Sequence, residues 1–283
     1  MKRLDLYKSC VGMLEQAEVE DAEFDALCIF QDMLGDKLPL FCPQEEVPAE
    51  AEQRILSLVS ERCSGRPLQY LLGQWEFFGY PFCVGEGVLI PRPATETLVE
   101  NVIEICRREG MTHPHIIDLC SGSGCIAIAL KKELPGAEVT ALELSEKAFG
   151  YLEKNIALNG AEVRAELCSV TDPETASRFR DMDIIVTNPP YLTPEEMASL
   201  QREVRHEPEQ ALAGGSDGLD FYRIIASLWR DTLREGGWLC CEYGDGQHED
   251  VKKILLENSY GNITLCRDLA GIMRTASAQK TGG

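Results

Sequence analysis

The motif Asn188-Pro189-Pro190-Tyr191 combines groups that could hold a planar amide or amino group. It follows an apolar run at 183–187, which predicts a buried strand. Proline has no N–H, so the motif offers carbonyl acceptors, and Asn188 adds a side-chain oxygen beside an aromatic plane. Open α/β sheets bind their ligands at the carboxyl ends of strands. The motif is therefore a candidate catalytic and substrate-binding site, although Asn-Pro is also a common turn signal.

A second candidate site begins at the predicted strand His115–Leu119, which leads through a small-residue turn into an apolar helix. Such a turn lets a ligand approach the backbone, and the helix N-terminus offers free N–H groups. The next predicted strand, Glu138–Leu142, is followed by an acid about 20 residues after the turn, where a carboxylate can accept ribose hydroxyls. The candidate cofactor-binding residues here are Asp118, Cys120, Ser121, Gly122, Ser123, Gly124 and Glu143.

The two sites together predict a bound nucleoside with a carboxylate tail. A P-loop would need Gly-Lys-Ser/Thr at the turn, whereas Lys131 and Lys132 lie at the far end of the following helix. A Rossmann dehydrogenase fits the turn but does not account for the proline motif. S-adenosylmethionine fits both, with its amino-acid end near the turn, its ribose at Glu143 and Asn188 close to it.

Composition limits the function classes. The chain has 283 residues and 27 Lys and Arg against 47 Asp and Glu, a formal net charge of −20, which argues against a protein that mainly grips nucleic-acid phosphates. Its twelve cysteines are scattered without metal-ligand spacing, which predicts free thiols in a reducing cytosol and no metal site. We find neither a signal peptide nor an apolar run of membrane-spanning length, so we expect a cytoplasmic protein away from the membrane.

The elements that must position these residues fall into two kinds. The first 65 residues predict a small helical bundle, and the aromatic-rich segment that follows predicts a hairpin turning at 79–81. Beyond the helix predicted at Pro93–Arg108, strands and helices alternate, which favours a parallel doubly wound α/β sheet. The further predicted strands are 164–168, 183–187, 237–242, 263–267 and 274–279, and a loose tail is expected from Gln279 onward.

Several longer motifs make the chain resemble the PrmC/HemK family, the protein-(glutamine-N5) methyltransferases that modify peptide-chain release factors. The segments 67–73, 88–93 and 204–208 are similar to the family's linker, the entrance to its catalytic domain and the stretch after its catalytic tetrapeptide. The resemblance implies a class I S-adenosylmethionine-dependent methyltransferase with a seven-stranded, mostly parallel sheet. It implies a helical substrate-recognition domain at 1–73, a β-hairpin linker at 74–90 and the methyltransferase domain at 91–283.

The resemblance also implies roles for residues. Asp172 and Pro173 would lie near the adenine, while Asn188 to Tyr191 would hold the glutamine of the Gly-Gly-Gln motif of bacterial-type release factors. The family usually has glycine at Cys120 and glutamate at Ala94. We expect the turn to tolerate Cys120 because its backbone there is extended, and Glu96 to remain as a carboxylate near the site.

Two other functions are compatible with the motifs. An amino-methyltransferase acting on adenine or cytosine in nucleic acid uses similar Asn/Asp-Pro-Pro-Tyr chemistry on a flipped base, but no basic target-recognition segment is present. A methyltransferase fold disabled at Cys120 would be a binding protein without activity. We expect instead an enzyme that acts on release factors, with no direct nucleic-acid substrate.

Overall fold

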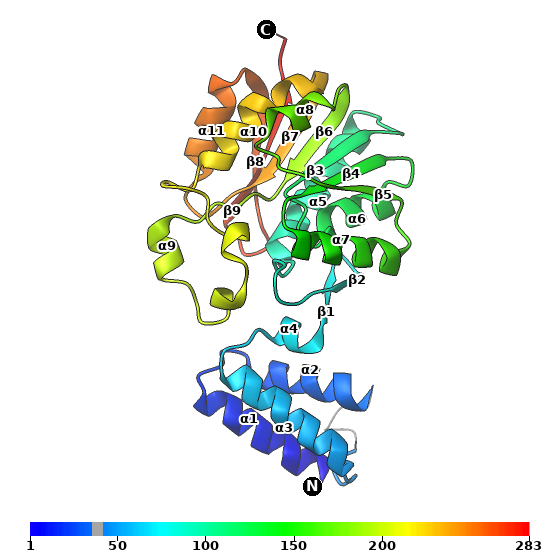
Figure 1. The fold of residues 1–283 in the computed structure, drawn as a ribbon, viewed down its shortest axis with the longest axis vertical. Helices are drawn as coiled ribbons and strands as arrows, with labels where there is room; N and C mark the ends of the chain where they lie inside the picture. The colour runs from blue at the N-terminus through cyan, green and yellow to red at the C-terminus, as the bar shows by residue number, and fades with distance from the viewer. Residues whose placement is uncertain (36–41, 283) are drawn as a thin grey trace. The chain divides into compact units, whose positions relative to one another are not determined.

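The computed structural model describes residues 1–35 and 42–282 and divides into two compact units. One unit comprises residues 1–74 and 201–206, and the other comprises 75–200 and 207–283. The helices of the first unit are α1 (Arg3–Gln16), α2 (Ala22–Leu34), α3 (Ala49–Cys63) and the short α4 (Leu68–Leu72), with a 3-10 turn at Val204–His206 (Figure 1).

The helices of the first unit pack around an apolar core, in which the rings of Tyr7 and Phe30 meet edge to face at 5.6 Å. One buried ionic group crosses this unit. The Arg62 Nε donates to Asp25 Oδ2 at 2.5 Å, and its Nη2 donates to Glu203 Oε1 at the same distance. Because Glu203 is far along the chain, this group ties the segment 201–206 to α2 and α3.

The second unit is built on a seven-stranded sheet in the order β5-β4-β3-β6-β7-β9-β8. All neighbouring strands are parallel except β9, which runs antiparallel to β7 and β8. The expected seven-stranded, mostly parallel fold is therefore confirmed. The strands are β3 (His115–Leu119), β4 (Glu138–Glu143), β5 (Val163–Leu167), β6 (Met182–Thr187), β7 (Leu233–Glu242), β8 (Tyr260–Arg267) and β9 (Met273–Lys280).

Helices cover both faces of this sheet because successive strand residues point to opposite sides. In β3, Ile116 packs into one apolar core and Ile117 into the other. The first core includes α5, α6 and α7, and the second includes α10 and α11 (Figure 1). The helices are α5 (Pro93–Arg108), α6 (Cys125–Glu133), α7 (Glu146–Asn159), α8 (Pro173–Ser177), α9 (Pro194–Ala198), α10 (Asp220–Leu228) and α11 (His248–Glu257), with 3-10 turns at Glu209–Ala211 and Arg230–Thr232.

The hairpin consists of β1 (Gln74–Phe77) and β2 (Tyr80–Cys83). Phe78 and Gly79 both have positive φ, as the tightest hairpin turns require. The Glu96 carboxylate accepts a hydrogen bond from the Phe78 amide at 2.7 Å, so it binds the hairpin.

At the other end of the chain, the expected loose tail from Gln279 is wrong for its first two residues. Gln279 and Lys280 belong to β9, where Gln279 pairs with Trp238 and Lys280 with Tyr260. The Lys280 Nζ also donates to the Leu233 carbonyl oxygen at 2.7 Å. Pairing with two strands therefore orders a segment whose polar composition predicted a loose tail.

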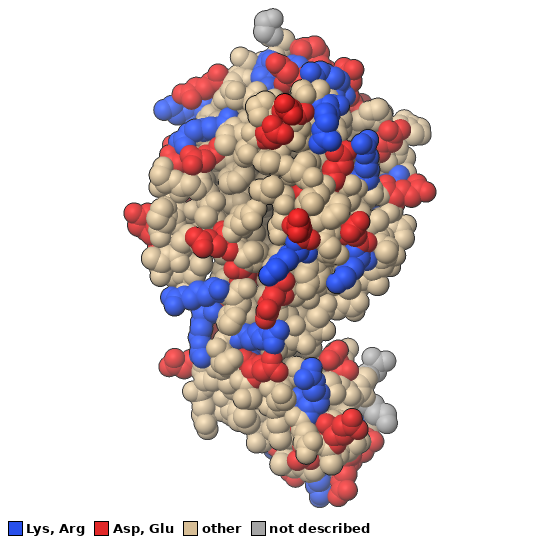
Figure 2. Space-filling model, viewed as in Figure 1, with Lys and Arg blue, Asp and Glu red and all other residues tan. Residues whose placement is uncertain are grey.

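Charged side chains of both signs are interspersed on the face shown in Figure 2, where lysines and arginines stand among acidic and uncharged residues. Within residues 1–35 and 42–282, no helix has the length and apolar character needed to cross a membrane.

Candidate active site

The site lies at the carboxyl end of the parallel strands, where the strand order reverses. β3 is central, with β4 on one side and β6 on the other, so the connections that follow β3 and β6 run in opposite directions and leave a crevice between them. One pocket of the second unit occupies this crevice. Its lining includes the predicted site residues Cys120, Ser121, Gly122, Ser123, Glu143, Asn188 and Pro190.

The turn between β3 and α6 is held by backbone hydrogen bonds. The Ser121 amide donates to the Leu142 carbonyl oxygen at 2.9 Å, and the Gly124 amide donates to the Ser121 carbonyl oxygen at 2.8 Å. Gly124 has φ +80°, and a Cβ there would lie 2.4 Å from a methyl carbon of Leu152. This position therefore requires glycine, which lets α6 begin close to α7.

Cys120 departs from the expectation made from sequence. Its φ is +64°, in the left-handed region, so the prediction of an extended backbone at this position was wrong. A side chain in this conformation costs about 1–2 kcal/mol relative to glycine. Burial raises the pKa of the Cys120 thiol far above its usual range, so the thiol is neutral in the pocket wall.

The Glu143 carboxylate binds the turn from the end of β4. Its Oε2 accepts from the Gly122 amide at 2.8 Å, and its Oε1 accepts from the amides of Leu144 and Ser145 at 3.0 and 2.7 Å. A carboxylate has about four acceptor positions, so Glu143 keeps capacity for a ligand hydroxyl. The side chain therefore shapes the turn and faces the pocket at the same time.

Asp118 lies beneath the pocket and does not line it. Its side chain is fully buried, and neither carboxylate oxygen has a hydrogen-bond partner within the described part of the chain. Burial raises the pKa of Asp118 to about 8. A carboxyl group in this environment is largely neutral at pH 7.

Asp172 and Pro173 also stand outside the pocket lining. The Asp172 carboxylate caps α8, because it accepts from the amides of Glu174 and Thr175 at 3.1 and 3.3 Å. The pocket is lined at this point by the residues just before the cap, which are Ser169, Val170 and Thr171.

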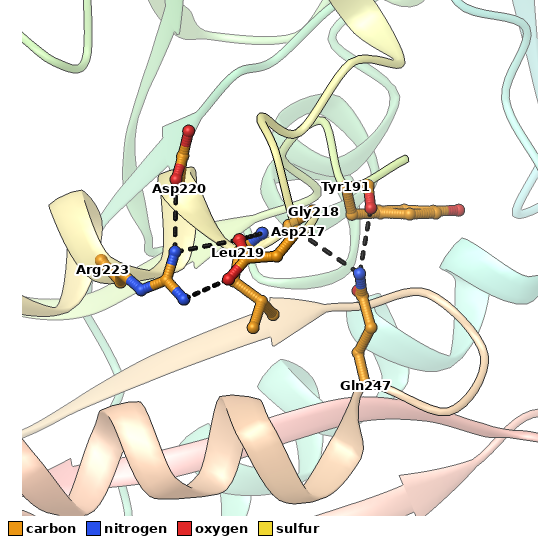
Figure 3. A network of polar contacts seen from close by, with 7 residues as sticks. All are labelled: Tyr191, Asp217, Gly218, Leu219, Asp220, Arg223 and Gln247. Atoms are coloured by element: carbon orange, nitrogen blue, oxygen red, sulfur yellow. Dashed lines mark hydrogen bonds and ion pairs between the residues drawn. The ribbon is translucent and has the colours of Figure 1, made fainter. Parts of the chain in front are cut away.

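Hydrogen bonds from side chains to backbone carbonyl oxygens hold the proline motif on the opposite side of the pocket. The buried Thr187 hydroxyl donates to the Leu119 carbonyl oxygen at 2.7 Å and joins the ends of β6 and β3. Gln247 Nε2 donates to the Tyr191 carbonyl oxygen at 3.0 Å, as Figure 3 shows, and the Gly244 amide donates to Gln247 Oε1 at 2.9 Å.

Close packing also fixes Tyr191. A Cβ on Gly214 would lie 2.5 Å from the Tyr191 Cα, and one on Gly218 would lie 2.4 Å from the Tyr191 carbonyl oxygen. The loop containing these glycines can therefore approach the motif only because they lack side chains. Figure 3 shows the Tyr191 ring extending away from the exposed cluster of Asp217, Asp220 and Arg223. Burial raises the pKa of Tyr191 to about 12, so its phenol stays protonated at neutral pH.

Sequence reasoning missed several residues that support the pocket. Glu207 is buried, and its carboxylate accepts from the Ile90 amide at 3.1 Å and pairs with Arg92, which joins two segments far apart in the sequence. Asn155 on α7 accepts from the Cys83 amide at 2.6 Å and donates to the Ser123 carbonyl oxygen at 2.9 Å. Both stand among other polar and charged residues in the sequence, so nothing local distinguished them.

Two buried polar side chains, Thr95 and Glu242, lie at the proline motif itself. Asn188 Nδ2 donates to Thr95 Oγ1 at 3.3 Å, and Glu242 is 2% exposed at the end of β7. Thr187 pairs with Cys241 in the register of β6 and β7. Asn188, directly after β6, therefore lies beside Glu242, the last residue of β7.

Comparison with known proteins identifies the family. The PrmC N-terminal domain model matches residues 5–73, and the methyltransferase small domain model matches residues 93–216. A release factor glutamine methyltransferase of Geobacter sulfurreducens is 38% identical over 95% of this chain and 93% of its own. One from Fusobacterium nucleatum is 37% identical over 99% of this chain and 79% of its own. The chain belongs to the release factor glutamine methyltransferase family.

Solved structures agree with the fold of this family member. A methyltransferase from Pyrococcus furiosus has a TM-score of 0.54 at 16% identity and covers 83% of this chain and all of its own. The 16S rRNA N2 G1207 methyltransferase RsmC of T. thermophilus has a TM-score of 0.53 at 22% identity and covers 73% of this chain and 49% of its own. The family resemblance and the class I methyltransferase fold expected from the motifs are both confirmed.

Proposed function

We propose that this protein transfers a methyl group from S-adenosylmethionine to the side-chain amide nitrogen, N5, of the glutamine in the Gly-Gly-Gln motif of peptide-chain release factors. The observation that carries the proposal is that Glu143, the turn residues 120–123, and Asn188 and Pro190 of the proline motif line one pocket. The relatives named above supply the substrate class, and they match the chain from its N-terminal helices to its last strands.

The residues present fit this cofactor. The turn offers backbone N–H groups at the start of α6, which suit a carboxylate, and Glu143 retains acceptor positions for ribose hydroxyls. We assign the amino-acid end to Cys120 through Gly124 above Asp118, and the ribose to Glu143. Since the Asp172 side chain caps α8, we assign the base to Ser169–Thr171, with Asp172 and Pro173 only bounding that end. S-adenosylmethionine supplies a methyl group bonded to a positively charged sulfur.

The protein's task is to orient a weak nucleophile. An amide nitrogen shares its lone pair with the carbonyl group, so it attacks poorly unless its geometry is fixed. We propose that Asn188 Oδ1 and the Pro189 carbonyl oxygen accept the two N–H bonds of the substrate amide. These acceptors stabilise positive charge that develops on the nitrogen, and Pro190 and Tyr191 bound the amide plane. Positioning of this kind can lower a barrier by about 7–11 kcal/mol in favourable systems.

Tyr191 does not take part as a base, because its phenol is protonated at neutral pH. The carboxylate near the motif is that of Glu242, which is shielded from solvent. The proton that the substrate nitrogen gives up therefore passes to water at the pocket mouth.

An enzyme acting on bases in nucleic acid is not favoured. The chain carries 47 acidic against 27 basic residues, and lysines and arginines on the face in Figure 2 are interspersed with acids. A protein without activity is not favoured either, since the acceptor motif and the ribose acid are both present.

The test is incubation of the protein with methyl-labelled S-adenosylmethionine and either a release factor or adenine-containing DNA. We expect label in the release factor. We expect Asn188→Ala to reduce the rate by about 10²- to 10³-fold while cofactor binding remains, since one preorganised acceptor is lost. Label in DNA and none in release factor would overturn the proposal.

A further inference from the structure

Three polar side chains from different elements meet behind the proline motif. Thr95 is on the first turn of α5, Asn188 follows β6, and Glu242 ends β7. Thr95 and Glu242 are each only 2% exposed, so water does not satisfy their polar atoms. The buried Glu242 Oε2 has no hydrogen-bond partner among the described residues, so a donor from Thr95 or Asn188 is what this oxygen needs.

The direction of the hydrogen bonds follows from the chemistry of each group. Asn188 Nδ2 donates to Thr95 Oγ1, so the threonine oxygen acts as an acceptor here. A hydroxyl has one hydrogen to donate, and that hydrogen remains available for another acceptor. We assign Glu242 as that acceptor, because it ends β7 beside Asn188 and its buried Oε2 lacks a partner among the described residues. Burial raises the pKa of this carboxyl, and the proximity of Thr95 and Asn188 lowers it by less.

An ionised carboxylate can only accept hydrogen bonds, so it sets the direction of the whole chain of bonds. With Glu242 ionised, the Thr95 hydrogen points to the carboxylate and the Thr95 lone pairs face Asn188. The Asn188 amide must then present its nitrogen to Thr95, and its oxygen is left for the pocket that Asn188 lines.

We propose that Glu242, together with Thr95, acts as a positioning residue that fixes the Asn188 amide with its oxygen, Oδ1, toward the substrate. The inference rests on the proposed function, because Oδ1 has a role only if an N–H group of the acceptor is bound there. It gives a role in the reaction to Thr95 on α5 and to Glu242 on β7, neither of which belongs to the Asn-Pro-Pro-Tyr motif.

The surroundings of Glu242 make the orientation of the Asn188 amide sensitive to pH. Burial raises the pKa of Glu242 to about 7, and Arg274 on β9 and Arg92 ahead of α5 lower it less. Other titratable groups that interact with Glu242 are Tyr191 after β6, Tyr222 on α10, Cys125 on α6 and Cys241 on β7, all of them neutral thiols or phenols at pH 7. The Tyr222 hydroxyl donates to the Glu242 backbone oxygen at 2.9 Å.

Protonation turns the Glu242 carboxyl group into a donor. The Thr95 hydroxyl is then no longer required to donate toward Glu242, and the orientation of Asn188 loses its constraint. Methyl transfer should therefore fall as the pH drops below about 7. Binding of S-adenosylmethionine should not follow this titration.

The first test compares matched variants in steady-state methylation of release factor. Thr95→Val removes the hydroxyl and should lower kcat by about 10-fold or more, with KM for release factor and Kd for S-adenosylmethionine within about twofold. Thr95→Ser should recover most of the lost kcat because it restores the hydroxyl. Thr97→Val, the same change on the same helix at a buried threonine outside the pocket lining, is the control. A kcat for Thr95→Val equal to that of Thr97→Val would overturn the proposal.

The second test does not depend on activity. The side-chain amide resonances of Asn188, identified by their loss in Asn188→Ala, should shift with a midpoint near pH 7 in the unmodified protein and stay constant in Glu242→Gln. Resonances that do not titrate in the unmodified protein would refute the positioning role. Titrating resonances in a protein that leaves release factor unmethylated would support the positioning role and contradict the proposed function, so the two failures are distinguishable.

Discussion

Replacement of Glu143 by alanine tests the cofactor site at the point where its shape and its chemistry depend on one side chain. The carboxylate accepts hydrogen bonds from the amides of Gly122, Leu144 and Ser145 at 2.7 to 3.0 Å. Glu143→Ala removes all three hydrogen bonds together with the proposed acceptor of the ribose hydroxyls. The variant should therefore bind S-adenosylmethionine more weakly, even if the protein remains folded.

The magnitude follows from the kind of bond that is lost. Hydrogen bonds to a charged group contribute about 1.5–3 kcal/mol, and each 1.4 kcal/mol changes a dissociation constant about tenfold. Loss of the ribose bonds alone should raise Kd by about 10- to 150-fold. The freed amides at the turn lie next to the pocket, where water can reach them, so they add less than buried groups would.

Isothermal titration with S-adenosylmethionine measures the effect directly. Glu146→Ala is a matched control, because it removes an exposed acid three residues away that is not part of the pocket lining. We expect the control to bind as the unmodified protein does. A Kd for Glu143→Ala within threefold of the control would refute the assignment of the ribose to Glu143.

Three further predictions concern stability. Cys120→Gly should stabilise the fold by up to about 1 kcal/mol in thermal unfolding, because glycine adopts the left-handed φ of +64° without strain; a loss of more than 1 kcal/mol would contradict this. Arg62→Met should destabilise the N-terminal helices by about 3–5 kcal/mol in urea, because it leaves the buried Asp25 carboxylate unpaired, and an unchanged midpoint would count against the buried pair. The folded-state pKa of Asp118 is raised to about 8, so the folded protein holds this proton more tightly than the unfolded chain does, and the unfolding free energy should fall as the pH rises from about 4 to about 8. Asp118→Asn should remove that slope, and the same slope in variant and parent would refute the burial argument.

Much of the sheet could be predicted from sequence because its strands are short apolar runs that end at polar or small residues. The bounds of β3 match the expectation, since His115–Leu119 is enclosed on both faces. β7 begins at Leu233, earlier than the predicted residue 237, since the strand continues through two glycines beside an irregular register at Met182 and Ile184. A pair of glycines predicts a strand break from sequence. In the sheet, pairing with a neighbouring strand can continue on both sides of the glycines.

The site could be predicted only where it is local in sequence. Glu143 and Asn188 stand at the ends of predicted strands, so it was foreseeable that they lie at the same edge of the sheet. In the structure both line one pocket. Glu207 and Glu242 were not foreseeable as site residues, because their partners are not neighbours in the sequence: Ile90 is 117 residues from Glu207, and Thr95 and Asn188 lie on other elements than Glu242. The left-handed φ of Cys120 was missed for another reason: a cysteine carries no sequence signal for a conformation that usually selects glycine.

Mass spectrometry of a purified release factor, after incubation with this protein and S-adenosylmethionine, tests the central claim most directly. Fragmentation should locate a mass gain of one methyl group on the side chain of the glutamine in the Gly-Gly-Gln motif. A factor in which that glutamine is replaced should gain no mass, and neither should the intact factor incubated with Asn188→Ala for the same short time. A methyl group on another residue, or none on the factor while S-adenosylmethionine is bound, would contradict the account.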